Sequence, residues 1–267
     1  MQVVDLTDKY FHFVSLCTHI DDPNEERDSI VSIRESWLRE AMTKGLTVKV
    51  AIDEQGNPVG FAHCLPIELG AWGMSGKDLM TVPCLTRCYK HVYNCEHGSG
   101  IGKALMEAVE TEAKSNKKGV AVLAYDQDFW FMHYRFFKKL GYKEVARQGH
   151  AVIMLKAFER VDPPVMHRSK YALRPVPGKI VVDAFWNPMC LTSVLEMKRV
   201  REACAQYPDK VILNEYNTWN KDILDKYEIN RALFINGEYK CWGYAAPQDE
   251  LKEEIDKALE KVTQQEV

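Results

Sequence analysis

The sequence lacks several features that mark specialised classes of protein. Its 267 residues carry 35 Lys or Arg against 38 Asp or Glu, a formal net charge of −3. There is therefore no basic excess of the kind that binding to a nucleic-acid backbone requires. No run reaches the roughly 18 apolar residues of a membrane span. Residues 1–16 do not show the basic start and apolar run of a signal peptide. These absences predict a cytoplasmic protein that binds neither nucleic acid nor a membrane.

Cysteine is present, but not in the arrangement of a disulfide framework or of a zinc site. The eight cysteines include no Cys-x-x-Cys pair, and thiols in the cytoplasm stay reduced. The densest group comprises Cys84, Cys88, His91, Cys95 and His97. Structural zinc sites usually hold two closely spaced ligand pairs, and here the single Cys-x3-Cys lies partly on a predicted strand. We therefore expect free thiols and predict no metal site.

Helix and strand patterns alternate over residues 1–158. Apolar residues at steps of three to five indicate helices, and β-branched or continuous apolar runs between turn residues indicate strands. The predicted elements are helices over 25–43 and 101–116, a hairpin turning at 55–57, strands over 79–87, 119–125 and 150–158, and a short aromatic helix that ends at Leu140 with Gly141 as its cap.

A second α/β pattern follows a break in periodicity. Residues 159–178 contain four prolines and read as a linker. Beyond it we expect strands over 180–186 and 211–217, a helix over about 190–206, a hairpin at 236–237 and a terminal helix. The sequence thus predicts an α/β protein with domains at 1–158 and 179–267, joined by the linker 159–178.

The most informative stretch is His-Gly-Ser-Gly-Ile-Gly-Lys at 97–103, which opens the clearest helix. Glycines allow a tight turn and close approach of a ligand. The first N–H groups of a helix have no internal acceptor and carry partial positive charge, so such a turn suits a pyrophosphate. The spacing is neither that of a Walker A loop nor of a dinucleotide fingerprint. The alternative is a helix that simply starts after a flexible loop.

This glycine turn, the apolar strand at 119–125 and the segment Arg-Phe-Phe-Lys-Lys-Leu-Gly-Tyr-Lys-Glu-Val at 135–145 occur in that order. Together they resemble the GNAT superfamily of N-acetyltransferases, whose pyrophosphate motif is Gln or Arg, two residues, then Gly-x-Gly. His97 takes the Gln or Arg place, and Gly100 and Gly102 form the pair. The resemblance implies the GNAT fold, a mixed central sheet flanked by helices, over residues 1–158. It also implies direct transfer of an acetyl group from acetyl-CoA to an amine of an unidentified small molecule or peptide. A homodimer is one assembly to test.

The resemblance also assigns residues to the cofactor. Acetyl-CoA would lie between two central strands, one of which carries a bulge whose unpaired backbone groups bind the pantetheine arm. Pro83 fits a disrupted position in the strand at 79–87, because it cannot donate to a ladder. Leu85 and Arg87 are the expected backbone contacts. The expected pyrophosphate contacts are His97, Gly98, Ser99, Gly100, Ile101, Gly102 and Lys103.

A tyrosine in the late helix often protonates the departing thiolate in this family, but Phe137 occupies that place here. Phe137 is thus expected only to line the cofactor. Tyr134, three residues earlier, is the expected catalytic acid, with a packing role as its alternative and His133 as a weaker candidate. Sequence does not rank the groups that could deprotonate the amine, which are His63, Glu68 and Asp126.

The second domain resembles the thioredoxin fold. Phe185, Trp186 and Cys190 match the spacing of its strand end and nucleophilic thiol, and a helix N-terminus favours a thiolate. Ser193 replaces the second redox cysteine, and Arg231 stands where a cis-proline is usual. The combination resembles the YoaP-like group of N-acetyltransferases. Two alternative functions stay open, namely a thiol-redox or thiol-binding protein that uses Cys190 and a non-catalytic acyl-CoA-binding protein.

Overall fold

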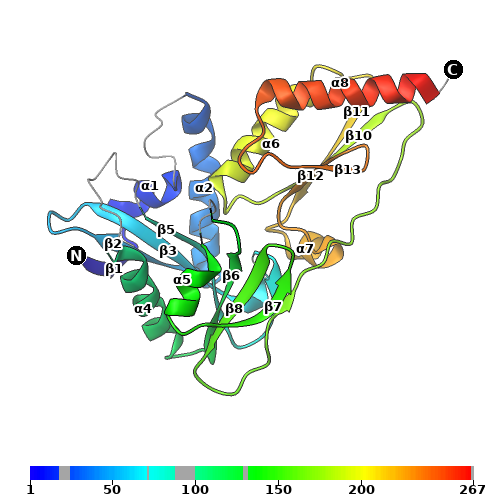
Figure 1. Ribbon diagram of the computed structural model, residues 1–267. Coiled ribbons are helices and arrows are strands. Elements are labelled where there is room, and N and C mark those ends of the chain that lie inside the picture. The colour runs from blue at the N-terminus through cyan, green and yellow to red at the C-terminus, as the bar shows by residue number, and fades with distance from the viewer. Residues whose placement is uncertain (18–24, 71, 88–99, 129–131, 266–267) are drawn as a thin grey trace. The chain divides into compact units, whose positions relative to one another are not determined.

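The computed structural model describes residues 1–17, 25–70, 72–87, 100–128 and 132–265 (Figure 1). The chain folds into two compact units, each with more contacts within it than with the other. The first comprises Met1–Asn24 and Glu35–His167, and the second comprises Glu25–Arg34 and Arg168–Val267. Helix α2 (Glu25–Thr43) therefore contributes its first residues to one unit and its remainder to the other. Among the described residues, no helix has both the length and the apolar character needed to cross a membrane.

The first unit contains a seven-stranded mixed sheet in the order β1-β2-β3-β5-β6-β8-β7. Every neighbouring pair is antiparallel except β5 and β6, which run parallel. A small separate sheet joins β4 (Met74–Ser75) to β9 (Val165–Met166). The strands of the large sheet are β1 (Gln2–Asp5), β2 (Thr47–Ile52), β3 (Pro58–Pro66), β5 (Met80–Arg87), β6 (Gly119–Tyr125), β7 (Lys143–Gln148) and β8 (Ala151–Ala157).

Helices cover both faces of this sheet. Side chains alternate between the two faces along each strand, so β3 contacts helices on both sides. Ala62 and Cys64 of β3 share one hydrophobic cluster with α4 (Ile101–Ala113), and the short helix α5 (Tyr134–Lys139) lies on the same side. Phe61 and His63 point to the other side, toward α1 (Asp8–Leu16) and α2. The 3-10 turn η1 (Ile67–Leu69) follows β3.

Helix α4 forms where the sequence predicts it. Its buried residues recur at helical spacing and face the sheet; they are Ile101, Leu105, Met106, Val109, Glu110 and Ala113. Strand β6 is buried on both faces except at Tyr125, as its uninterrupted apolar sequence predicts. Helix α5 ends at the expected place, and Gly141 takes the left-handed conformation with φ 87°.

The second unit has a four-stranded sheet in the order β11-β10-β12-β13. Strand β10 is parallel to β11 and antiparallel to β12, and the predicted hairpin joins β12 to β13. Asn236 and Gly237 have φ values of 50° and 85°, the left-handed pair that a tight hairpin turn requires. The elements are β10 (Ile180–Trp186), α6 (Leu191–Cys204), β11 (Val211–Asn217), α7 (Lys221–Tyr227), β12 (Ala232–Ile235), β13 (Glu238–Lys240) and α8 (Gln248–Gln265).

Helices α6 and α8 pack together over one hydrophobic cluster of this sheet. A second cluster, on the opposite face, contains Phe185 and Phe234, and it includes Tyr171 from the proline-rich segment. The rings of Tyr171 and Phe234 stack with centroids 3.8 Å apart. Tyr171 also donates a hydrogen bond of 2.8 Å to the buried carboxylate of Asp183. The second half of the predicted linker is thus packed against the second unit.

Candidate functional site

Strands β5 and β6 pair at only two positions and then part. Met80 lies beside Val120 and Thr81 beside Ala121, and no further pair joins the two strands within the described residues. Each strand still pairs along its other edge, β5 with β3 and β6 with β8. We call this divergence, from Val82 to Arg87 on one side and from Val122 to Tyr125 on the other, the β5–β6 fork. Over these stretches the facing edges of β5 and β6 do not pair with each other.

A bulge in β5 lies at the start of the fork. His63 of β3 pairs with Cys84 and Leu65 pairs with Thr81, so Val82 and Pro83 together oppose a single residue of β3. Proline has no N–H to give to the ladder, which explains why the irregularity falls here. The bulge bends β5 away from its parallel neighbour. The sequence-based prediction of a disrupted position at Pro83 agrees with this register.

Helix α4 begins with an uncapped turn. Gly100 precedes the helix with φ 75°, a left-handed conformation, and as a glycine it has no side chain that could cap the first N–H groups. The first turn holds no acidic residue, and a Cβ built on Gly100 meets no atom of the described residues within 4 Å. The N–H groups of Ile101, Gly102 and Lys103 lack intrahelical acceptors by virtue of their position. This end of the helix can therefore receive an anion.

Two glycines bring α4 close to its neighbours. A Cβ on Gly60 of β3 would lie 2.7 Å from the Thr86 carbonyl oxygen and 2.9 Å from Ile101 Cγ2. A Cβ on Gly102 would lie 3.1 Å from Phe136 Cζ. The first turn of α4 thus sits beside both the fork and α5. Sequence reasoning missed Gly60, although a glycine inside a strand is the signal for such an approach.

The wide end of the fork is closed by the segment that leads into α5. Tyr125 of β6 forms a parallel bridge with His133, and its N–H donates to the Met132 carbonyl at 3.1 Å. Because the other edge of Tyr125 pairs with Ala151 of β8, this segment occupies the edge that faces β5. Tyr134 follows at once as the first residue of α5, so α5 starts at the fork.

The surroundings of Tyr134 are partly polar. Its side chain is half-buried, its ring stacks on His133 with centroids 5.1 Å apart, and the Arg147 guanidinium lies 5.2 Å from the ring centroid. His133 caps α5 by accepting from the Arg135 N–H at 3.2 Å. Phe137, in contrast, is fully buried in the core. Tyr134 is therefore partly exposed beside the fork, whereas Phe137 is not.

Other candidate groups differ in how they are held. His63 is fully buried on β3, with its ring 5.6 Å from that of Trp37. Its cross-strand neighbour is Cys84, which is half-buried. Cys64, next in the chain, is not a nucleophile, because burial raises the pKa of its thiol to about 12. His63 and Cys84 thus lie on the face of the fork opposite α4.

The carboxylates of Glu68 and Asp126 both have polar partners. Glu68 accepts a 2.7 Å hydrogen bond from the Asp78 N–H, just before β5 begins and so at the closed end of the fork. Asp126 follows β6 and forms an ion pair of 2.7 Å with Arg147. Of the three deprotonation candidates, Glu68 is therefore the one held at the wrong end of β5.

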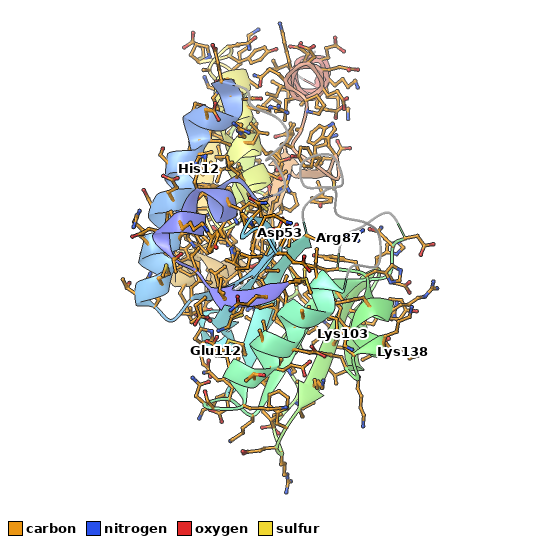
Figure 2. The ribbon with its side chains drawn as sticks, turned by 90° about the vertical axis from the view of Figure 1, so that its left-hand side faces the viewer. His12, Asp53, Arg87, Lys103, Glu112 and Lys138 are labelled. Atoms are coloured by element: carbon orange, nitrogen blue, oxygen red, sulfur yellow. The ribbon has the colours of Figure 1, made fainter. Side chains whose placement is uncertain are left out.

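Leu85 and Arg87 lie where the backbone contacts are expected, on the part of β5 that borders the fork. They oppose Ala62 and Gly60 of β3. Being two residues apart, they direct their backbone groups to the same edge of the strand. Leu85 packs against the core, whereas Arg87 is exposed at the end of β5 (Figure 2). His97, Gly98 and Ser99, with the other metal-ligand candidates Cys88, His91 and Cys95, lie outside the described residues.

In the second unit, Cys190 precedes α6 as its N-cap residue and is half-buried. Ser193, at the place of a second cysteine, is buried, and its hydroxyl accepts from the Asn187 N–H at 3.0 Å. Arg231 is held by Glu196 at 2.9 Å and by the Tyr244 carbonyl at 2.8 Å. The serine therefore shapes the turn before α6 and offers no thiol partner to Cys190.

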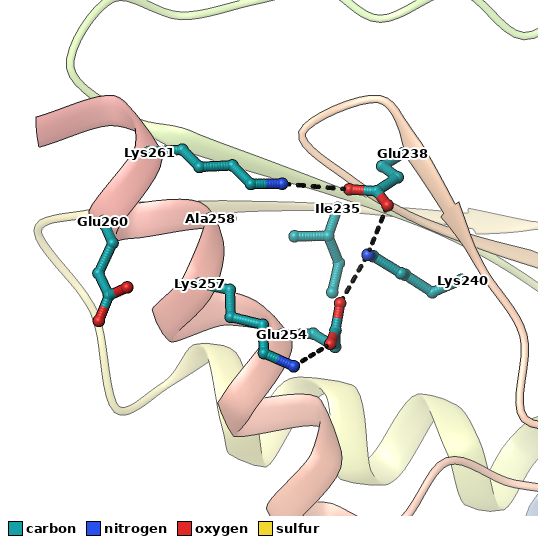
Figure 3. Close-up of a pocket in the computed structure, with 8 residues that line it drawn as sticks. All are labelled: Ile235, Glu238, Lys240, Glu254, Lys257, Ala258, Glu260 and Lys261. Carbon is teal, nitrogen blue, oxygen red and sulfur yellow. Dashed lines mark hydrogen bonds and ion pairs between the residues drawn. The ribbon is translucent and has the colours of Figure 1, made fainter. Parts of the chain in front are cut away.

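A groove of about 480 Å³ also lies in the second unit, between β13 and α8 (Figure 3). Three lysines and three glutamates line it, and most of them pair with one another. Lys240 binds Glu254 at 2.6 Å and Glu238 at 3.0 Å, and Lys257 binds Glu254 at 2.9 Å. Its charges cancel, so the groove favours no charged ligand. In the described part of the chain, no three metal-ligating side chains gather.

No protein-family model matches the chain, and no curated protein does. Solved structures that it resembles include an aminoglycoside 6′-acetyltransferase type Ii, at 17% identity over 61% of this chain and 100% of that one, with a TM-score of 0.44. A ribosomal-protein-alanine N-acetyltransferase from Brucella melitensis is 16% identical over 59% of this chain and 99% of that one, with a TM-score of 0.43. The PaiA N-acetyltransferase from Thermoplasma acidophilum, in complex with coenzyme A, is 15% identical over 59% of this chain and 99% of that one, with a TM-score of 0.41.

Proposed function

We propose that the first unit is an acetyl-CoA-dependent N-acetyltransferase of the GNAT type. The observation that carries the proposal is a combination of three neighbouring features. These are the β5–β6 fork, the bulge at Val82 and Pro83, and the uncapped α4 turn after Gly100. A fork lets an amide-bearing chain enter between two strands that do not pair with each other, and a helix N-terminus supplies N–H donors for phosphates. Coenzyme A carries both chemical groups.

In this proposal the cofactor runs from the α4 turn into the fork. The pyrophosphate accepts hydrogen bonds from the N–H groups of Ile101, Gly102 and Lys103, and the sequence predicts further contacts from His97, Gly98 and Ser99. The two amides of the pantetheine arm bond to the inner edge of β5, at Leu85 and Arg87. The thioester then lies between the two strands, where backbone N–H groups can polarise its carbonyl.

The reaction is direct transfer. The neutral amine nitrogen attacks the thioester carbonyl carbon, the carbon–sulfur bond breaks, and the nitrogen releases a proton to water, from which the phenol of Tyr134 regains the proton that it gives to the thiolate. Tyr134 gives its phenolic proton to the departing CoA thiolate, because it begins α5 beside the fork. Phe137 cannot do so, since it has no ionisable group and no exposed surface. The acceptor is a small molecule or peptide that presents a primary amine.

The proposal is tested by following CoA release from acetyl-CoA with a panel of amines and peptides, using the full chain. Turnover with at least one amine is expected, and the acetylated product identifies the acceptor class. Thermal unfolding with and without CoA runs beside it, because a ligand that binds the folded state raises the midpoint. If the midpoint rises but no amine is acetylated, the first unit is a non-catalytic acyl-CoA-binding module. If CoA leaves the midpoint unchanged, the proposal is wrong.

We propose further that the second unit is a thioredoxin-like domain. The observation in its favour is the order of its elements, in which a parallel strand–helix–strand unit precedes a helix, a hairpin and a final helix. Ser193 and Arg231 argue against dithiol exchange. A monothiol role for Cys190 stays a prediction, tested by titrating its thiolate against the variant Cys190→Ser.

A further inference from the structure

The first turn of α4 lies beside a basic edge formed with helix α5. Gly102 approaches Phe136 so closely that an added Cβ would lie 3.1 Å from its ring. The N-terminal turn of one helix therefore packs on the short second helix, whose sequence Tyr-Arg-Phe-Phe-Lys-Lys contains three cations and no acid. Figure 2 labels one lysine from each helix, Lys103 and Lys138.

Lys103 lies on the flank of α4 that faces α5. It precedes Glu110 by seven residues, which is close to two full turns, so the two residues share a flank. Glu110 forms an ion pair of 2.6 Å with Lys156, whose Nζ also donates to the Leu140 carbonyl at 2.9 Å. Leu140 is the residue that ends α5. Lys156 thus links this flank of α4 to the end of α5, so the flank that bears Lys103 faces α5.

Lys139 lies on the flank of α5 that faces α4. It follows Phe136 by three residues and so shares its side of the helix, whereas Lys138 follows by two and points away. The direction of Lys138 has independent support. The pKa of Glu144 in β7 is lowered mainly by its hydrogen bond to Arg147, and in smaller part by the charge of Lys138. Helical spacing therefore places Lys103 and Lys139 on the facing flanks of α4 and α5, and Lys138 on another side of α5.

Lys103 and Lys139 are available for an anion. Lys103 has only a loose ion pair of 3.7 Å with Glu107, with both side chains about two-thirds exposed. Within the described part of the chain, no ion pair links Lys139 to a carboxylate. The first turn of α4 contains no acid. A group with two negative charges, such as a phosphomonoester, therefore gains attraction from both lysines and meets little opposing charge.

Resting on the function proposed above, we propose that Lys103 and Lys139 bind the ribose 3′-phosphate of coenzyme A. They would thereby select coenzyme A over its 3′-dephospho form. Coenzyme A carries this third phosphate on the same ribose that bears the pyrophosphate. With the pyrophosphate on the α4 turn, the 3′-phosphate is confined to the neighbourhood of that turn, within reach of side chains as long as lysine. The edge between α4 and α5 is where those side chains lie.

The test compares coenzyme A with 3′-dephospho-coenzyme A by isothermal titration, using the full chain and two charge-matched variants. Lys139→Gln removes a lysine that faces α4. Lys138→Gln removes the adjacent lysine that faces away, so it controls for the loss of net charge. The native protein should bind coenzyme A about tenfold more tightly than the dephospho form at low salt. Lys139→Gln should lower that ratio to about threefold, because Lys103 keeps its share of the attraction, and Lys138→Gln should preserve it.

The outcomes separate the two proposals. If coenzyme A binds but the native protein does not distinguish the two ligands, the 3′-phosphate site is wrong and the acetyltransferase proposal stands. An equal effect of the two substitutions also overturns the site, because it reduces the preference to long-range charge. If neither ligand binds, the proposed function falls and this site falls with it. Circular dichroism of both variants verifies that these exposed substitutions leave the fold intact.

Discussion

Replacing Gly100 with leucine tests the anion-binding turn, and Gly149 offers a matched control. Both glycines have positive φ, 75° and 56°, and in the described part of the chain an added Cβ at either position meets no atom within 4 Å. A leucine at either site must adopt the left-handed conformation, which costs roughly 1–2 kcal/mol. Only the side chain at position 100 projects from the residue that opens α4. Gly149 lies in the turn between β7 and β8.

The magnitudes can be worked out for a thermal-unfolding assay. The strain alone should lower the midpoint of either variant by about 2–8 °C, at roughly 2–4 °C per kcal/mol for a unit of this size. Coenzyme A at a hundred times its dissociation constant adds about 2.7 kcal/mol to the folded state. The native protein and Gly149→Leu should therefore gain about 5–10 °C with the ligand. Gly100→Leu should gain nothing, because its side chain occupies the space before the N–H groups.

Two results would refute this reasoning. A ligand-dependent rise in Gly100→Leu equal to that of the native protein would mean that the α4 turn does not hold the cofactor. Loss of the rise in Gly149→Leu as well would mean that strain in either turn unfolds the first unit, and that position 100 is not special. Circular dichroism at 25 °C, recorded before each scan, establishes that both variants start folded.

Three further predictions follow from other contacts. Tyr134→Phe should lower turnover at least about tenfold with little change in CoA affinity; equal turnover in steady-state assays would remove Tyr134 as the acid. Asp183→Asn should destabilise the second unit by about 1–3 kcal/mol in urea unfolding, because the carboxylate accepts from Tyr171 and two other donors; an unchanged midpoint would contradict this. The hydrogen bond with Arg199 lowers the pKa of Glu26, so the stability it contributes is present above about pH 4.5 and is lost as pH falls through the lowered folded-state pKa. Glu26→Gln should reduce the loss of unfolding free energy between about pH 5 and 3, measured by urea unfolding at each pH. An unchanged pH dependence would contradict a contribution from the Glu26–Arg199 pair.

Much of the fold can be predicted because local patterns decide it. The strand expected at 119–125 is found over the same residues, and the helix expected from 101 begins at Ile101. Both have strong periodicity and clear boundaries. The hairpin at Asn236 and Gly237 also follows from local chemistry, because these residue types tolerate positive φ.

Other features depend on contacts between distant segments. The closure of the fork joins Tyr125 to His133, and nothing in either segment signals that bridge. The close approach of Gly60 to Ile101 depends on how α4 lies across the sheet. Tyr171 packs on the second unit through one aromatic ring and one hydrogen bond. Contacts made by isolated residues such as Tyr171 and Lys170 leave no periodic pattern, so the sequence around them is typical of a linker.

Some features of the candidate site could also be predicted from local sequence, and others could not. The glycine turn and the bulge at Pro83 could be predicted, since each depends on a residue type with a restricted backbone role. The deprotonation candidates could not be ranked, because Glu68 and Asp126 differ only in where the fold takes them. Glu68 accepts from Asp78 before β5 begins, and Asp126 lies beyond the end of β6.

The central claim is that backbone N–H groups at the start of α4 hold the diphosphate of coenzyme A. Titrating coenzyme A into ¹⁵N-labelled protein and following the amide resonances of Ile101, Gly102 and Lys103 tests this directly. The account predicts that these three move downfield together and saturate with the same dissociation constant as the calorimetric titration. Saturable binding of coenzyme A that leaves all three resonances unmoved would contradict it.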